Sequence, residues 1–216
     1  MHISFTFILL FLLNNNFCYS QPKNESNLRK PELVELIKLD STFHLDIRYA
    51  TTNNFVGQPV YKQARAFLQR PAADALVRVN KKLKEYGFGL LIFDGYRPWS
   101  VTKLFWDSAT EEERLVGFVA DPAKGSRHNR GCAVDLSLYN LATGKEVTMP
   151  SSYDEFNEKA YYMYEGGDPE VRGLRDLLIN TMESEDFKVL ETEWWHFDYK
   201  DWQLYPILNI NFEELK

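Results

Sequence analysis

The sequence predicts a single α+β domain with a mainly antiparallel central sheet flanked by helices. Two observations lead to this class: strand and helix patterns do not alternate regularly along the chain, and few connections resemble βαβ crossovers. A third is the length, because the 216 residues less a 20-residue leader leave 196, enough for one domain with a substantial core. No internal repeat is visible, and no apolar stretch beyond the leader approaches the length of a membrane span.

The first 20 residues form an uncharged segment with an apolar run from Ile3 to Leu13. This run is short for a permanent membrane anchor, so we expect a secretory signal peptide that is cleaved after Ser20. A polar linker over residues 21–29 and a folded domain over 30–216 would follow. A lipid anchor at Cys18 is the alternative. The protein is accordingly expected to be periplasmic or secreted.

Charge and cysteine content exclude several classes of protein. The net charge of −6 argues against a nucleic-acid partner. Once the leader is removed, Cys132 is the remaining cysteine, so no internal disulfide can form. The chain has no GxGxxG motif after a strand and no phosphate-binding loop, so a nucleotide cofactor is not implied.

The first half of the domain contains two strand patterns and two helix patterns. Apolar and polar residues alternate over residues 43–49, which predicts a half-buried strand with His44 facing solvent. A helix is expected from Pro71 to Tyr86, where Gly87 would end it. Residues 89–93 then form a short apolar run, typical of a buried strand, that delivers Arg97 to a turn; a second helix follows, from near Pro98 to Trp106.

The second half predicts a strand, a helix and a final strand. Alternation over residues 132–138 favours a strand whose polar face carries Asp135. Asp168 and Pro169 are typical of a helix start, and apolar residues at helical spacing continue to about Ser184. Residues 188–199 are predicted to form the last strand.

Two motifs in these strands supply a set of metal ligands. The first runs from Ser126 to Asp135, and the second is Glu193-Trp194-Trp195-His196. Zinc binds His nitrogen and Asp oxygen, and a catalytic zinc takes three protein ligands and leaves its fourth position to water. We predict one zinc ion per chain, held by His128, Asp135 and His196 and located on the sheet. Glu193 is the candidate general base for that water.

The spacing of Glu193 and His196 raises a geometric problem. Positions three apart in a regular strand point to opposite faces. We therefore expect a bulge or a bend at Trp194 and Trp195, or a Glu193 that precedes the regular strand. The two tryptophans themselves would either line the site or belong to the core.

Taken together, these residues resemble a known family, the zinc D-alanyl-D-alanine dipeptidases of peptidase family M15, which include the vancomycin-resistance dipeptidases. The resemblance covers nearly all of the chain after the leader. It runs through Asp46 to Thr51 with Asn54-Phe55, Asp94 to Pro98, Ser126 to Asp135, and Glu193 to His196.

The resemblance implies hydrolysis of D-Ala-D-Ala in peptidoglycan turnover or salvage. By position, Arg97 matches an arginine that supports the tetrahedral intermediate, which suits a guanidinium facing a growing negative charge. Tyr49 and Asp154 match positions that hold the free amino group of the dipeptide, and Ser126 matches a site serine with a smaller role. An export signal is a departure from the resistance enzymes, which act on a cytosolic pool, and makes a resistance role doubtful.

Two alternatives remain open, and both keep the zinc. The first is a D,D-carboxypeptidase or wall endopeptidase that acts on longer, amino-blocked peptides; a carboxylate at Asp154 that pairs with a substrate ammonium argues for a dipeptidase instead. The second is a non-catalytic, zinc-containing binding module. The presence of Glu193 and Arg97 argues against it. Oligomeric state cannot be derived from the sequence.

Overall fold

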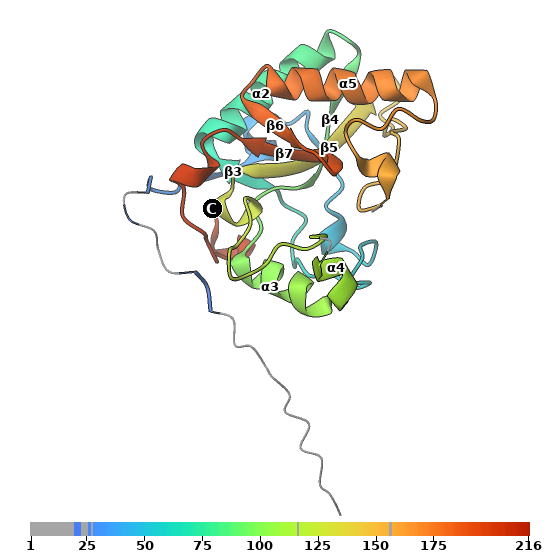
Figure 1. The fold of residues 1–216 in the computed structure, drawn as a ribbon. Coiled ribbons are helices and arrows are strands. Elements are labelled where there is room, and N and C mark those ends of the chain that lie inside the picture. The colour runs from blue at the N-terminus through green and yellow to red at the C-terminus, as the bar shows by residue number, and fades with distance from the viewer. Residues whose placement is uncertain (1–19, 23–25, 27, 116, 156) are drawn as a thin grey trace, which may run out of the picture.

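The protein is described here from a computed structural model, which covers residues 20–22, 26, 28–115, 117–155 and 157–216 (Figure 1). The expected signal peptide lies outside these residues except for Ser20. Within them, no helix is both long enough and apolar enough to span a membrane. Arg29 donates its amide hydrogen to the Leu204 carbonyl at 2.8 Å, so the end of the expected linker is held against the domain.

A five-stranded mixed sheet forms the centre of the fold, with the strand order β2-β4-β5-β7-β6. β2 and β4 pair in parallel, and the other three pairings are antiparallel, which confirms the predicted α+β class. β1 and β3 form a second, two-stranded antiparallel sheet. The strands are β1 (Leu33–Glu35), β2 (His44–Leu45), β3 (Phe67–Gln69), β4 (Phe88–Asp94), β5 (Ala133–Asn140), β6 (Phe187–Leu190) and β7 (Glu193–Tyr199).

Helices cover the sheet from two sides. α2 and α5 pack together on one side, whereas α3 and α4 lie on the opposite side of the molecule (Figure 1). The three predicted helices are confirmed with small shifts at their ends. Asp168 caps α5 by accepting the Glu170 amide at 2.8 Å, and Gly87 follows α2 with a positive φ of 84°. The helices are α1 (Leu36–Leu39), α2 (Arg70–Lys84), α3 (Trp99–Ser108), α4 (Glu111–Leu115) and α5 (Pro169–Glu183).

The strand expected over residues 43–49 is shorter than predicted. β2 ends at Leu45, and the chain then enters a 3₁₀ helix, Arg48–Ala50. The physical reason lies in the partners of the backbone: the Tyr49 carbonyl accepts the amides of Val60 and Tyr61, at 2.8 and 2.9 Å, in place of a neighbouring strand. This turn directs Tyr49 toward the cavity described below.

The prediction of a single final strand over residues 188–199 is wrong. The segment is a hairpin in which β6 and β7 pair in antiparallel fashion around Glu191 and Thr192. The sequence did not reveal this turn, because the turn contains no Gly, Pro, Asn or Asp and has apolar residues on both sides. The hairpin places β7, rather than β6, next to β5.

β5 is buried on both faces, although its sequence alternates between apolar and polar residues. Asp135 is 3% exposed and Ser137 is 0% exposed. The face that carries Asp135 is therefore covered as well, and polar residues there need partners inside the protein. For Asp135 these partners form the site.

The C-terminal segment, residues 205–215, binds several parts of the domain that lie far away in the sequence. The Leu208 amide donates to the Asn129 carbonyl at 2.9 Å, and the Tyr96 hydroxyl donates to the Ile210 carbonyl at 3.0 Å. Arg65 donates to the Phe212 carbonyl at 2.9 Å. The segment therefore supports the loop that carries His128 and the turn that carries Arg97.

Candidate active site

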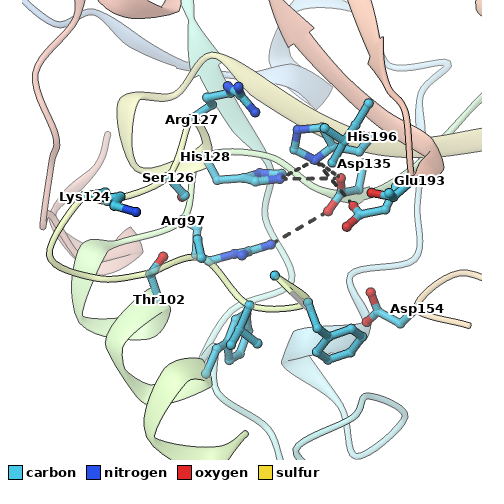
Figure 2. A pocket seen from close by; sticks show the side chains of 18 of the residues that line it. Arg97, Thr102, Lys124, Ser126, Arg127, His128, Asp135, Asp154, Glu193 and His196 are labelled. Atoms are coloured by element: carbon cyan, nitrogen blue, oxygen red, sulfur yellow. Dashed lines mark hydrogen bonds and ion pairs between the residues drawn. The ribbon is translucent and has the colours of Figure 1, made fainter. Parts of the chain in front are cut away.

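The three predicted metal ligands meet at one point beside the sheet (Figure 2). His128 begins a 3₁₀ helix, His128–Arg130, while Asp135 on β5 and His196 on β7 are direct partners across the antiparallel pair. His196 Nδ1 lies 3.0 Å from Asp135 Oδ1 and 3.2 Å from His128 Nε2. His128 Nε2 and Asp135 Oδ1 are 3.4 Å apart. All three side chains are buried, whereas His44 is exposed, as expected.

The other nitrogen of each imidazole has its own partner. His128 Nδ1 lies 2.7 Å from the Gly95 carbonyl, and His196 Nε2 lies 3.0 Å from Asp198 Oδ1. Both partners are acceptors, so a neutral ring at either position would donate its proton outward and direct a lone pair at the cluster. Together with the carboxylate of Asp135, two such lone pairs would favour a metal cation between the three side chains.

The donor set fits zinc. Zinc binds His nitrogen and carboxylate oxygen at about 2.0–2.2 Å, and a tetrahedral arrangement then puts the ligand atoms roughly 3.3 Å apart. The separations between the three donor atoms, 3.0 to 3.4 Å, agree with this value. His128, Asp135 and His196 can therefore hold a zinc ion with little rearrangement.

Glu193 lies beside this cluster because β7 carries a bulge. Val189 on β6 pairs with Phe197, but the next residue, Leu190, pairs with Glu193, so three residues of β7 are inserted between the two pairs. The predicted bulge is thus confirmed. Glu193 Oε2 lies 3.9 Å from His196 Nδ1, on the same side of the strand. Burial raises the pKa of Glu193, which brings it closer to the value that suits a general base near neutral pH.

Arg97 approaches the cluster from the end of β4 (Figure 2). Its Nε and Nη2 both contact Asp94 Oδ2, at 2.9 and 2.8 Å, and Nη2 lies 3.8 Å from Asp135 Oδ2. Burial alone lowers the pKa of Arg97, but nearby groups, with the Asp94 carboxylate first among them, together raise it well above its ordinary value. The guanidinium is therefore a fixed positive charge beside the three candidate metal ligands.

Asp154 and Tyr49 lie together at another part of the cavity wall. The Tyr49 hydroxyl donates to Asp154 Oδ2 at 3.0 Å. Burial, reinforced by the negative charge of Asp135, raises the pKa of Asp154 to about 8. Asp154 also has a positive φ of 59°, which is uncommon for a residue with a side chain and is typical of functional sites. The half-buried carboxyl group of Asp154 can therefore form an ion pair with a cation that enters the cavity.

One cavity of about 540 Å³ contains all eight residues that the sequence predicted for the site. It lies between the sheet and α3, and its wall includes Phe105 of α3 and Phe118 of the loop after α4. Ser126 lies on the opposite side of Arg97 from Asp154 (Figure 2). The Ser126 hydroxyl accepts the Asn129 amide at 3.2 Å. The eight residues are Tyr49, Arg97, Ser126, His128, Asp135, Asp154, Glu193 and His196.

Sequence reasoning missed three side chains that hold the site in place. Asp198 binds the ring of His196, Asp94 binds Arg97, and Tyr153 donates its hydroxyl to Asp135 Oδ2 at 3.1 Å. Asp198 could have been found, because it follows His196 by two positions and thus shares its face of the strand. Nothing in the sequence signals the other two partnerships.

The two tryptophans of the last motif belong to the core. Trp194 and Trp195 are each 1% exposed, and neither lines the cavity. Trp194 Nε1 donates to Ser151 Oγ at 2.9 Å, and Trp195 packs edge-on against Tyr153. They anchor the bulge between Glu193 and His196 from inside.

Comparisons with known proteins agree with this site. Residues 29–214 match the family model described as D-ala-D-ala dipeptidase, Peptidase_M15. The D-alanyl-D-alanine dipeptidase of Enterococcus faecalis (strain ATCC 700802 / V583) is 36% identical, over 81% of this chain and 95% of that protein. The enzyme of the same name from Escherichia coli (strain K12) is 30% identical, over 84% of this chain and 91% of that protein.

Among solved structures, similarity is more distant. An LD-carboxypeptidase, LdcB, has a TM-score of 0.42 and 22% identity, over 69% of this chain and 70% of that chain. A vancomycin-resistance D,D-pentapeptidase, VanY, solved with Zn(II), has a TM-score of 0.40 and 16% identity, over 64% of this chain and 75% of that chain.

Proposed function

Since the chain belongs to the D-Ala-D-Ala dipeptidase family, we propose that it hydrolyses D-alanyl-D-alanine to two D-alanines with one bound zinc ion. The observation that carries this proposal is the convergence of Glu193 and Arg97 on the cluster of His128, Asp135 and His196. A base, a cation and three metal ligands in one cavity match the needs of peptide hydrolysis.

Glu193 acts as the general base. Zinc held by the three ligands supplies a Lewis acid that lowers the pKa of water toward about 7 and polarises the scissile carbonyl. Glu193 removes the proton from the attacking water and then delivers it to the leaving amine, so one carboxylate serves both steps. Its raised pKa makes the carboxylate a stronger base for the first of these transfers.

Arg97 meets the negative charge that develops on the carbonyl oxygen. Its guanidinium is already oriented by Asp94 before substrate binds, so no reorganisation is required when the charge appears. The rings of Tyr49 and Phe105, whose centroids lie 5.4 and 4.9 Å from Arg97 Cζ, restrict the guanidinium further and keep water away from it.

Asp154 determines which peptides are accepted. A substrate ammonium at this carboxylate replaces water with an ion pair and brings the carboxyl group into its charged form. An acetylated substrate would leave the same group desolvated and without a cation, which disfavours binding. This supports a dipeptidase over the alternative, a D,D-carboxypeptidase or endopeptidase on longer wall peptides.

An exported enzyme would act on dipeptide released from the cell wall. The support is the uncharged, apolar leader, Met1 to Ser20, with a lipid anchor at Cys18 as the alternative form. Peptidoglycan turnover or salvage is then the proposed role. Fractionation of cells and N-terminal sequencing test it: a start at Gln21 in the periplasm or medium supports it, and bulk cytosolic activity contradicts it.

The decisive assay compares D-Ala-D-Ala with its N-acetylated form, using the purified domain with zinc supplied and free D-alanine as the readout. Release from the free dipeptide alone is expected. Release from the acetylated form would favour the alternative function, a D,D-carboxypeptidase or endopeptidase. Release from neither would contradict the proposed activity and favour a binding module without catalysis.

A further inference from the structure

Asn129 follows the metal ligand His128 and lies at the junction of four segments. It is 0% exposed. Its side-chain Oδ1 accepts the Ser126 amide at 2.8 Å, and its Nδ2 donates to the Arg97 carbonyl and to Thr102 Oγ1, each at 2.8 Å. Its own carbonyl accepts the Leu208 amide at 2.9 Å. Both amide hydrogens and the amide oxygen are thus occupied.

These contacts connect Arg97 with the loop that carries the candidate metal ligand His128. Arg97 belongs to the turn after β4, 32 positions before Asn129, and the two meet only through the fold. The Arg97 backbone is held at both ends, because its amide donates to the His128 carbonyl at 3.1 Å while its carbonyl accepts from Asn129. Since Asp94 fixes the guanidinium, the remaining freedom is movement of the whole turn.

Such movement would change the distance between Arg97 and the metal ligands. A displacement of about 1 Å of a reacting group can cost about 10²-fold in rate. A buried amide whose three hydrogen bonds run to three different segments resists that displacement, because any shift leaves a buried polar group without a partner.

We propose that Asn129 is a positioning residue that sets the spacing between Arg97 and the metal-ligand loop. This inference rests on the proposed peptidase function, in which Arg97 stabilises charge in the transition state. Asn129 itself does not line the cavity. Its effect therefore acts through Arg97, on the rate of turnover rather than on substrate binding.

The test is steady-state kinetics on D-Ala-D-Ala for Asn129→Ala. We expect kcat to fall by about 10- to 100-fold, while KM changes by less than about threefold. Zinc affinity, measured by competition with a chromogenic chelator, should stay within about threefold of the wild type, because the His128 ring is held by the Gly95 carbonyl. An unchanged kcat, or a loss of zinc that accounts for the whole effect, would overturn the proposal.

Asn80 offers a matched control in another part of the fold. It too is 0% exposed; its Oδ1 accepts the Leu90 amide at 3.0 Å, and its Nδ2 donates to Asp40 and Thr42 at 2.8 and 3.0 Å. Asn80→Ala should lower the melting temperature while kcat stays within about twofold of the wild type. An equal loss of kcat in both variants would show that Asn129 contributes only to general stability. Asn129→Ser, which removes less volume, provides the same comparison if Asn129→Ala does not fold.

A double-mutant cycle with Arg97→Ala identifies the route of the effect. If Asn129 acts through Arg97, then Asn129→Ala should cost less than about twofold in kcat once Arg97 is absent. A full-sized additional loss would contradict the proposal.

Binding of a phosphinate analogue of the dipeptide gives a readout without turnover. The tetrahedral phosphinate resembles the transition state, so Asn129→Ala should weaken its binding more than that of D-Ala-D-Ala. Equal weakening would overturn the positioning role. A wild type that binds the phosphinate but releases no D-alanine would instead contradict the proposed function, so the two failures are distinguishable.

Discussion

Glu193 and His196 point into the same cavity although they are three positions apart on one strand. The bulge in β7 is what allows it, and Glu193 Oε2 ends 3.9 Å from His196 Nδ1. Glu193→Gln keeps the shape but cannot accept the proton of the attacking water. We expect kcat to fall by about 10²–10⁴-fold while one zinc per chain remains bound. Activity assays with metal analysis check this, and unchanged turnover would show that another group is the base.

Asp154 is expected to stabilise the substrate complex and destabilise the free enzyme. Burial raises its pKa in the folded state to about 8 from an ordinary value near 4. A group whose pKa is raised on folding binds its proton more tightly in the folded state, so stability falls as the pH rises from about 4 to about 8. Asp154→Asn, which never ionises, avoids this loss.

The free energy of unfolding of Asp154→Asn should therefore exceed that of the wild type at pH 8 by ~1–3 kcal/mol, with the difference shrinking toward pH 4. The same change should lower kcat/KM for D-Ala-D-Ala by about 10²-fold or more, because a substrate ammonium loses its anion. Thermal melts in the presence of a chelator, at several pH values, measure the first effect. A constant difference across pH would argue against the raised pKa.

At the scale of elements, the end of β4 and the small sheet determine the position of the His128 ring. A Cβ added at Gly95 would lie 2.7 Å from the Phe67 carbonyl oxygen of β3, and the backbone cannot yield easily there. Gly95→Ala must displace the Gly95 carbonyl that accepts from His128 Nδ1. We expect a stability loss of ~1–3 kcal/mol and a zinc affinity lower by roughly 10- to 100-fold.

Gly173 on α5 is the matched control for that substitution. A Cβ at this position meets nothing within 4 Å. Gly173→Ala should therefore stabilise the helix by about 0.5–1 kcal/mol and leave zinc affinity unchanged. If both alanines had the same effect on zinc, the contact with Phe67 would not be the cause.

The sequence predicted elements well where a local signal marks their ends. α2 and α5 each have a proline in the first turn, and Gly87 follows α2 closely, so their boundaries were nearly correct. The sequence-based prediction failed at the hairpin of β6 and β7, whose turn contains no residue typical of turns. It also overextended β2, because the backbone of Tyr49 finds its partners in residues 60 and 61, which no periodicity reveals.

The site shows the same division. The candidate metal ligands and Glu193, which the structure brings together in one cavity, could be proposed from the sequence because their residue types and spacing suit zinc chemistry. Asp94 and Asn129 were missed as partners of Arg97, because a buried hydrogen bond between segments leaves no pattern in a single sequence. Candidate reactive side chains can be proposed from sequence, whereas the groups that orient them required the structure.

At the scale of the whole molecule, zinc should contribute to stability, because its ligands come from separate parts of the chain. Among the described residues Cys132 is free and buried, so no disulfide ties these parts together there. A ligand at 1,000 times its Kd adds about 4 kcal/mol. For a domain of this size, removing zinc with a chelator should lower the melting temperature by about 10 °C.

Differential scanning calorimetry with and without chelator checks this expectation. Glu193→Gln should show the same response as the wild type, since it keeps all three ligands, whereas His196→Ala should show little. A reducing agent should leave the melting temperature unchanged. Equal melting temperatures of the wild type with and without chelator would contradict a metal that is bound only by the folded state.

The C-terminal segment has a consequence for how the enzyme is made. The segment that follows His196 holds the loop of Asn129 through Leu208 and the turn of Arg97 through Ile210. The cavity therefore cannot be completed until synthesis has passed Ile210 and this stretch is free to fold back onto the domain. A nascent chain is inactive until then, and a chain that is cut before Leu208 lacks both contacts.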